Sequence, residues 1–393
     1  MKVVHLNTYT EGGAAQAALR INDALLKQCF GGLSIESKFL ALYNNQNKVA
    51  IDFRDELNVF ENYFLKLKNK LRALKLEKKY YEAEELFSEL ETVWEVKKHS
   101  LIKNSDILHL HWISSFVDIP SFFHLQNKKI VWTLHDYFPF SGGFHYPINE
   151  IKEEWFKKIE LQKDIIEKIF SETKIDFVFP SEYLKQIAKD SNALGNNNCQ
   201  VIKNPVDVNL FKPLDKNACR DKHLINKTKP VLFFLSDYFN YPRKGFALLA
   251  KALSLINKEV TLITAGRGKL PSVIGKAEIK YFGLVQNNNL LVELYNCADL
   301  LVNPSLADIS SNTVIEAMAC GIPSVTFATG GIPELITEVN GIIANETSAQ
   351  ALAESINLAL SKNYDPGKIK SLAEQNHSFE VIGKKYATLY SPL

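Results

Sequence analysis

At 393 residues the chain is too long for one ordinary domain and long enough for two. Its hydrophobic content of 46% and charged content of 23% exclude extensive disorder, and a net charge of +2 is too small to indicate a nucleic-acid partner. No stretch approaches the roughly 18 apolar residues that span a bilayer, and the five cysteines form no C-x-x-C pair. These features predict a cytoplasmic protein of two domains without a zinc site or a disulfide framework.

Short apolar runs bounded by turn residues alternate with helical patterns along the whole chain. The runs are continuously apolar, which is typical of parallel strands covered on both faces. The alternation predicts an α/β protein with two doubly wound, Rossmann-like sheets. The expected strands of the first sheet are Val3–Asn7, Ile35–Leu42, Ile107–Trp112, Ile130–Asp136, Phe177–Ser181 and Gln200–Lys203. Those of the second are Val231–Ser236, Val260–Ala265, Ile279–Gly283, Leu300–Pro304, Pro323–Phe327 and Gly341–Ala344.

The strongest candidate for a domain boundary is Asn204-Pro205-Val206-Asp207, because a polar stretch rich in Pro, Asn, Asp and Lys follows it up to Lys229. We therefore expect an N-terminal domain at 1–205 and a C-terminal domain at 206–377. The remaining residues, 378–393, predict a C-terminal helix.

The segment from Asn58 to His99 departs from this pattern and predicts a helical insert at about 58–100 in the first domain. It contains little Gly or Pro, and its first half interleaves leucines with basic residues. The basic residues are Lys66, Lys68, Lys70, Arg72, Lys75, Lys78 and Lys79. Such a helix can lie on an anionic membrane surface, here the inner face of the membrane. The alternative is a long solvated helix or helical hairpin, which the acidic second half favours. The acidic residues are Glu82, Glu84, Glu85, Glu89 and Glu91.

Two loops of the first domain carry residues suited to ligand binding. Gly12 and Gly13 join the first strand to a helix, whose N-terminal N–H groups favour phosphate. His135 and Asp136 close an apolar strand, where open α/β sheets place their ligands. Each feature also has a structural interpretation, because a glycine can merely turn the chain and a histidine can be satisfied by a neighbouring carboxylate.

In the second domain, Arg243 and Lys244 stand side by side between a strand and a helix. Two cations at this place suit a diphosphate, because they neutralise the charge that leaves with a nucleotide. Surface Arg-Lys pairs are common, so this feature alone is only suggestive.

The region 303–323 is the most specific part of the sequence. A strand ends, a polar loop carries Asp308, and a helix starts near Asn312 with Glu316 in its first turns. Two carboxylates at this spacing can both face one cleft, and the N–H groups of Ser310 and Ser311 between them are ready for hydroxyl or phosphate oxygens. Glu316 stands among apolar residues, where a merely solvated carboxylate has no evident reason to be.

Together these residues resemble the retaining, nucleotide-sugar-dependent glycosyltransferases of the GT-B fold, glycosyltransferase family 4 (group 1). The resemblance runs nearly end to end, and residues 304–333 are its most specific part. It implies two Rossmann-like domains that face each other across a cleft. The N-terminal domain (1–205) would be the acceptor side, the C-terminal domain (206–377) would bind the nucleotide sugar, and the helix at 378–393 would pack back on the N-terminal domain. The stretch 133–146 resembles transferases of capsule, O-antigen lipopolysaccharide and exopolysaccharide biosynthesis.

Carried over position by position, the resemblance implies a role for each site residue. Glu316 would hold the ribose hydroxyls of the donor nucleotide, and Asp308 would contact the donor sugar. Arg243 and Lys244 would bind the diphosphate and stabilise its leaving charge, while His135 would lie by the reacting sugar carbon. The remaining donor-binding positions are Gly12, Gly13, Ser310, Ser311 and Asn312.

The resemblance further implies a hexose-type sugar donated by a UDP- or GDP-linked co-substrate and a saccharide or lipid-linked saccharide acceptor. The acceptor side is expected near His109, His111 and Trp112. No Asp-x-Asp motif is present, so no metal and no further cofactor are expected. Asp308 departs from the pattern, because the family usually has Glu followed by Gly-Phe-Gly there. A catalytically silent, nucleotide-sugar-binding subunit and a GT-B epimerase are the alternatives.

Overall fold

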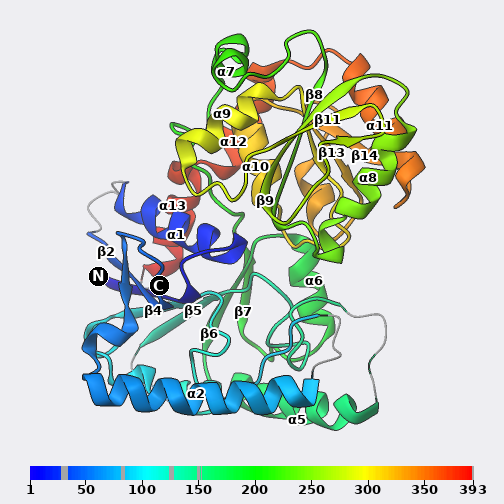
Figure 1. Cartoon of the computed structure of the whole chain (residues 1–393). Coiled ribbons are helices and arrows are strands. Elements are labelled where there is room, and N and C mark those ends of the chain that lie inside the picture. Colours follow the sequence, from blue (N-terminus) through cyan, green and yellow to red (C-terminus); the bar gives the residue numbers. More distant parts are fainter. Residues whose placement is uncertain (28–33, 81–84, 124–127, 148–150, 152, 392–393) are drawn as a thin grey trace. The chain divides into compact units, whose positions relative to one another are not determined.

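A computed structural model of the chain (Figure 1) describes residues 1–27, 34–80, 85–123, 128–147, 151 and 153–391, except the side chains of 73, 75–80 and 154. The chain forms two compact units. One comprises residues 1–203 and 382–393, and the other residues 204–381. The predicted boundary at 205/206 thus lies two residues from the division at 203/204.

The first unit is built on a seven-stranded parallel sheet of order β3-β2-β1-β4-β5-β6-β7. Its strands are β1 (Lys2–Tyr9), β2 (Glu36–Tyr43), β3 (Ala50–Asp52), β4 (Ile107–Leu110), β5 (Lys129–Thr133), β6 (Ile175–Phe179) and β7 (Asn198–Val201). Its helices are α1 (Gly13–Leu26), α2 (Val59–Tyr80), α3 (Ser100–Asn104), α4 (Ile119–Phe122), α5 (Glu153–Glu172) and α6 (Glu182–Asp190), with the short η1 (Phe53–Glu56) and η2 (Val96–Lys98). The central strands are buried on both faces, as their continuous apolar runs require.

The C-terminal helix α13 (Phe379–Tyr390) closes one face of this first sheet. Ile382, Tyr386 and Tyr390 are fully buried in one apolar cluster with Val3 and Ile107 of the sheet. Residues 382–393 therefore belong to the first unit, although the residues directly before them, 204–381, form the second.

The second unit carries another seven-stranded sheet, of order β10-β11-β9-β8-β12-β13-β14, in which only the β10–β11 pair is antiparallel. Its strands are β8 (Val231–Tyr238), β9 (Val260–Arg267), β10 (Val273–Ile274), β11 (Ala277–Tyr281), β12 (Leu300–Asn303), β13 (Ser324–Phe327) and β14 (Gly341–Ala344). Its helices are α7 (Lys216–Lys222), α8 (Phe246–Leu255), α9 (Asn288–Cys297), α10 (Asn312–Ala319), α11 (Ala349–Ser361) and α12 (Pro366–His377), with η3 (Pro242–Lys244) and η4 (Ile332–Leu335). Two apolar clusters cover the two faces of this sheet. The predicted fold class is confirmed.

The predicted insert at 58–100 is helical mainly in α2. The described residues from Glu85 onward form irregular structure, with Leu90 and Trp94 buried, so the hairpin alternative does not hold for them. Glu82 and Glu84, and the side chains of Lys75, Lys78 and Lys79, lie outside the described part. Among the helices of that part, none has the length and apolar character that crossing a bilayer needs.

Candidate active site

Each sheet has one topological switch point, where the chain turns from building one side of the sheet to building the other. In the second unit it lies between β8 and β12, because β9 and β11 extend one side and β13 and β14 the other. Ligands of open α/β sheets bind outside the carboxyl ends of the strands at this point. The loops after β8 and β12 are those that carry Arg243, Lys244 and Asp308.

The two loops are joined by an ion pair and by backbone contact. Lys244 Nζ lies 3.1 Å from Asp308 Oδ2, and both side chains are partly exposed. The amide of Leu306 donates to the carbonyl oxygen of Arg243 at 2.7 Å. Gly245 has φ 71°, and a Cβ there would stand 1.8 Å from the Pro304 carbonyl oxygen. Close backbone packing therefore brings a cation and a carboxylate that are distant in sequence to one edge of the sheet.

A third loop, after β13, supports Asp308 from the other side. Gly331 donates its amide to the Asp308 carbonyl oxygen at 3.1 Å. Gly330 has φ 56°, and a Cβ there would come within 1.8 Å of the same oxygen. Thr329 Oγ1 donates to the Ser305 carbonyl oxygen at 2.7 Å. The position of the Asp308 carboxylate is thus fixed by three loops.

Glu316 lies on α10 and is only 5% exposed. One of its carboxylate oxygens accepts a hydrogen bond of 2.7 Å from the Tyr295 hydroxyl on α9. A buried carboxylate is costly unless hydrogen bonds satisfy it. Tyr295 therefore holds Glu316 in place and leaves its second oxygen to be satisfied by other groups.

Polar side chains order the start of α10. Ser311 is its N-cap and accepts from the amide of Val314, while Asn303 Nδ2 donates to Ser311 Oγ at 2.6 Å. Asn312 accepts from Asn204 Nδ2 at 3.0 Å. Ser310 Oγ is buried with no hydrogen-bond partner among the described residues. The loop thus holds the helix N-terminus, with its positive dipole end, beside Asp308.

Sequence reasoning missed an aromatic and cationic group at the ends of β8 and β9. The Arg267 guanidinium lies over the Tyr238 ring at 5.0 Å, and Tyr238 lies 5.1 Å from Tyr241. Arg243 in turn lies 5.8 Å from the Tyr241 ring. The glycines on either side of Arg267, both at positive φ, are the sequence signal that could have located this group.

In the first unit, the switch point lies between β1 and β4. The loop after β1 carries Gly12, with φ 91°, and α1 begins at Gly13. A Cβ at Gly12 would meet nothing within 4 Å, so backbone conformation rather than crowding favours glycine there.

His135, after β5, begins a chain of hydrogen-bonded histidines that runs into the sheet. His135 Nε2 lies 3.2 Å from His111 Nδ1, and His111 Nε2 lies 2.9 Å from His5 Nδ1. Burial lowers the pKa of His135 to about 4 and that of His5 to about 3, and it lowers the pKa of His111 well below its usual value. Near neutral pH these rings are therefore neutral, so His135 can donate or accept a hydrogen bond but carries no positive charge.

The expected acceptor contacts of His109 and His111 need correction. His109 is fully buried, and its ring nitrogens bond to Tyr390 at 2.6 Å and to Thr133 at 2.7 Å. His111 is 2% exposed, and both its nitrogens bond to other histidines. Neither ring is available to an acceptor.

Trp112, the third expected acceptor residue, is half-buried at the end of β4. Its indole Nε1 donates to Asp136 Oδ2 at 2.7 Å, and the same carboxylate oxygen lies 2.6 Å from His145 Nδ1. The partner of Asp136 is therefore Trp112 with His145, and not the adjacent His135. This arrangement fixes the indole ring beside Tyr9, with 5.6 Å between ring centroids.

Among the described residues, one group has metal-ligating side chains close together: His5, His109 and His111, with one nitrogen of each within 4.8 Å of the others. All three are buried and lie on the neighbouring strands β1 and β4 or directly after β4. His5 and His111 bond to each other, and His109 bonds to Tyr390 and Thr133. His5 Nε2 is buried without a hydrogen-bond partner among the described residues.

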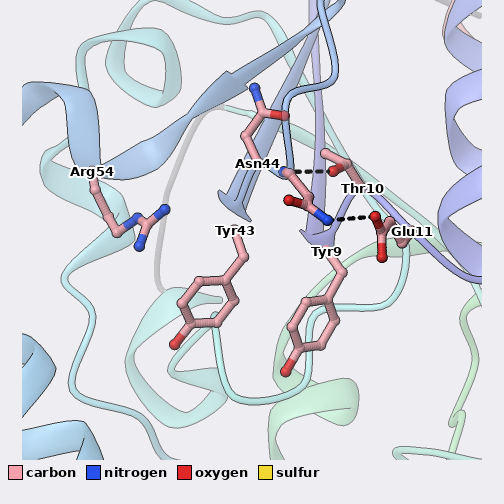
Figure 2. A pocket seen from close by; sticks show the side chains of 7 residues that line it. Tyr9, Thr10, Glu11, Tyr43, Asn44 and Arg54 are labelled. Carbon is pink, nitrogen blue, oxygen red and sulfur yellow. Dashed lines mark hydrogen bonds between the residues drawn. The ribbon is translucent and has the colours of Figure 1, made fainter.

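A pocket of about 340 Å³ opens at the ends of β1 and β2 in the first unit (Figure 2). It is lined by Tyr9, Thr10, Glu11, Tyr43, Asn44, Asn45 and Arg54. The Tyr9 and Tyr43 rings stack with centroids 5.4 Å apart, and the Arg54 guanidinium lies 5.1 Å from the Tyr43 ring. The pocket combines an aromatic floor with charged and amide groups, a chemistry suited to a polyhydroxylated ligand.

Known proteins share this architecture. Residues 229–362, from before β8 through α11, match the family model of glycosyl transferases group 1. The Anabaena protein HepE, solved with UDP and with UDP-glucose, superposes with a TM-score of 0.69 at 16% identity, covering 100% of both chains. WaaG, a glycosyltransferase of lipopolysaccharide biosynthesis, gives a TM-score of 0.61 at 16% identity, again over 100% of both chains.

Curated relatives are more similar in sequence and cover less of the chain. A GDP-mannose-dependent monoacylated phosphatidylinositol monomannoside mannosyltransferase from Corynebacterium glutamicum is 25% identical over 47% of this chain and 54% of its own length. The chain thus spans about half of that relative. An uncharacterized glycosyltransferase from Methanocaldococcus jannaschii is 25% identical over 72% of this chain and 75% of its own. The chain therefore has the GT-B fold, and its residues 229–362 match the family model of glycosyl transferases group 1.

Proposed function

We propose that the protein is a retaining glycosyltransferase that moves a hexose-type sugar from a UDP- or GDP-linked donor to a saccharide or lipid-linked saccharide acceptor in surface polysaccharide biosynthesis. The observation that carries this proposal is the Lys244–Asp308 pair at the switch point of the second sheet, with Glu316 buried on α10, the helix that follows the Asp308 loop. HepE was solved with UDP and UDP-glucose, which supports a nucleotide sugar as donor.

The residues fit the charge changes of sugar transfer. Breaking the sugar–phosphate bond develops negative charge on the diphosphate, which Lys244 and Arg243 stabilise without a metal ion. The N-terminus of α10 adds N–H groups for phosphate or hydroxyl oxygens. Glu316 accepts from ribose hydroxyls, and Asp308 accepts from a hydroxyl of the donor sugar.

The first unit offers a binding site for the acceptor. We assign the acceptor to the pocket around Tyr9 and Tyr43, since stacked aromatic rings bind the apolar faces of sugar rings. Trp112 borders Tyr9 and extends this aromatic surface. Within the first unit, His135 offers a neutral hydrogen-bonding group, and Gly12 and Gly13 lead into the N-terminus of α1, which favours phosphate.

The test is incubation with a panel of UDP-, GDP- and ADP-sugars, with and without a chelator. We expect slow release of nucleoside diphosphate from one donor, insensitive to the chelator, and retained anomeric configuration in any glycoside formed. Binding without turnover would instead identify a silent subunit, and interconversion of the free nucleotide sugars would identify an epimerase.

A further inference from the structure

Helix α2 presents its apolar side chains to solvent. Its half-buried side chains are Asn62, Leu65, Asn69 and Arg72, which share one face at helical spacing. The opposite face carries Phe60, Tyr63, Phe64, Leu67, Leu71 and Leu74, all exposed. Phe60 is 78% exposed and Tyr63 69%. A surface helix of a globular protein normally shows the reverse arrangement.

The inward face of α2 is polar and anchored. Arg72 donates to Glu89 at 2.6 Å, and Lys158 of α5 reaches the same carboxylate at 3.0 Å. Asn69 Nδ2 donates to the Tyr43 hydroxyl at 3.4 Å. At the N-terminus, Asn58 and Glu61 form a capping box through reciprocal side-chain to backbone bonds. These contacts fix the rotation of the helix, so its exposed apolar face is set by how the helix is built into the unit. Helix α2 runs along the border of the first unit (Figure 1).

Exposed lysines border the apolar face on both sides. At 100° per residue, Lys66 and Lys70 lie along one edge and Lys68 along the other. Glu61, the one acidic residue among positions 59–74, is engaged in the cap at the helix start. An apolar stripe between rows of cations matches a bilayer surface, where apolar side chains enter the acyl region and lysines meet anionic headgroups. Pairing with a second copy would bring lysine rows of equal sign together, which disfavours a dimer through this face.

We propose that the outward face of α2 docks the protein on an anionic lipid bilayer. The contact lies in the first unit and does not depend on the donor. Its consequence for the acceptor rests on the proposed function: the anchored face of α2 touches Tyr43, which lines the proposed acceptor pocket, so docking holds that pocket close to lipid headgroups. The partner is thus the surface on which a lipid-linked acceptor resides.

Vesicle flotation of the full chain tests the proposal, with phosphatidylcholine vesicles alone and with phosphatidylglycerol added. We expect flotation only with the anionic vesicles, weakening as salt is raised. The double variant Phe60→Ser/Phe64→Ser should lose at least about tenfold in partitioning. Lys66→Gln/Lys68→Gln/Lys70→Gln should lose about 100-fold at low salt, since each lysine near the surface contributes about fivefold.

The matched control is Leu358→Ser, which removes a similarly exposed leucine from α11 in the other unit and should leave flotation unchanged. All variants alter exposed side chains, and equal thermal unfolding checks that they fold. Flotation of the Phe60→Ser/Phe64→Ser variant at the wild-type level would overturn the proposal, as would a wild-type protein that stays with the unbound fraction or self-associates through this face. Because flotation uses no donor, its failure is distinct from absence of sugar transfer.

Discussion

Lowering the pH should destabilise the first unit through its buried histidines. His5, His109 and His111 are at most 2% exposed, and burial is the largest cause that lowers the pKa of each. For His5 the folded-state pKa is about 3, against 6.5 for an unperturbed histidine. Below pH 6.5 these histidines therefore bind protons in the unfolded chain but stay unprotonated in the folded chain. Above pH 6.5 the neutral histidines therefore cost the folded state no stability. As the pH falls from 6.5 toward the folded-state pKa, the free energy of unfolding decreases.

The size of the effect follows from this linkage. At about pH 5.5 the buried His5 ring lowers the free energy of unfolding by roughly 1.4 kcal/mol relative to about pH 7.5, and His109 and His111 act in the same direction. An ordinary domain is stabilised by only about 5–15 kcal/mol, so the change is measurable. Urea unfolding at both pH values measures it. Tryptophan fluorescence reports on the first unit alone, because all four tryptophans, at 94, 112, 132 and 155, lie there.

The variant His5→Gln isolates one ring of the chain. We expect the difference in its free energy of unfolding between the two pH values to shrink by about 1.4 kcal/mol, because one histidine that is protonated only in the unfolded chain has been removed. The control is Phe39→Leu, because Phe39 is fully buried and its ring stacks on His5. This substitution should lower the free energy of unfolding equally at both pH values. A wild-type free energy of unfolding that does not change with pH, or a full pH difference in His5→Gln, would refute the reasoning.

Three further predictions concern the second unit. Lys244→Ala should lower the rate of nucleoside diphosphate release by about 100-fold or more. The control Lys251→Ala, which changes an exposed lysine of α8, should leave this rate unchanged. Equal rates in the two variants would exclude Lys244 from the mechanism. Glu316→Gln should raise the donor KM, measured by initial rates, at least about tenfold, and Tyr295→Phe should raise it less. An unchanged KM in Glu316→Gln would exclude the ribose contact. Gly330→Ala should lower both turnover and the melting temperature, because its Cβ would stand 1.8 Å from the Asp308 carbonyl oxygen; wild-type activity in a well-folded variant would contradict the three-loop arrangement.

The sequence predicted the central strands well because they are buried on both faces. Continuous apolar runs located twelve strands, with ends that differ by up to three residues from the structure, as for Ile130–Asp136 against β5 (Lys129–Thr133). The short edge strands β3 and β10 were not predicted, because strands of three and two residues carry no recognisable pattern. The irregular run after α2 was also missed, since its acidic residues suggested a second helix.

For the candidate site, the sequence located loops but not partners. The loops with Lys244 and Asp308 were recognised by composition, whereas their ion pair joins residues 64 positions apart. Tyr295 lies on a different helix from Glu316, and no local signal connects them. His109 and His111 looked like surface contacts because they end a strand. The structure instead buries both, His109 against α13 and His111 between His5 and His135. The place of α13 on the first sheet depends on tertiary packing.

The central claim is that the second unit binds the nucleotide diphosphate of a sugar donor. Thermal unfolding with UDP, GDP, ADP and their sugars tests it most directly, because a ligand at about 100 times its dissociation constant adds roughly 2.7 kcal/mol of stability. We predict stabilisation by one nucleoside diphosphate and its sugars, and a much smaller effect in Glu316→Ala. Absence of stabilisation by every nucleotide, or full stabilisation of Glu316→Ala, would contradict the claim.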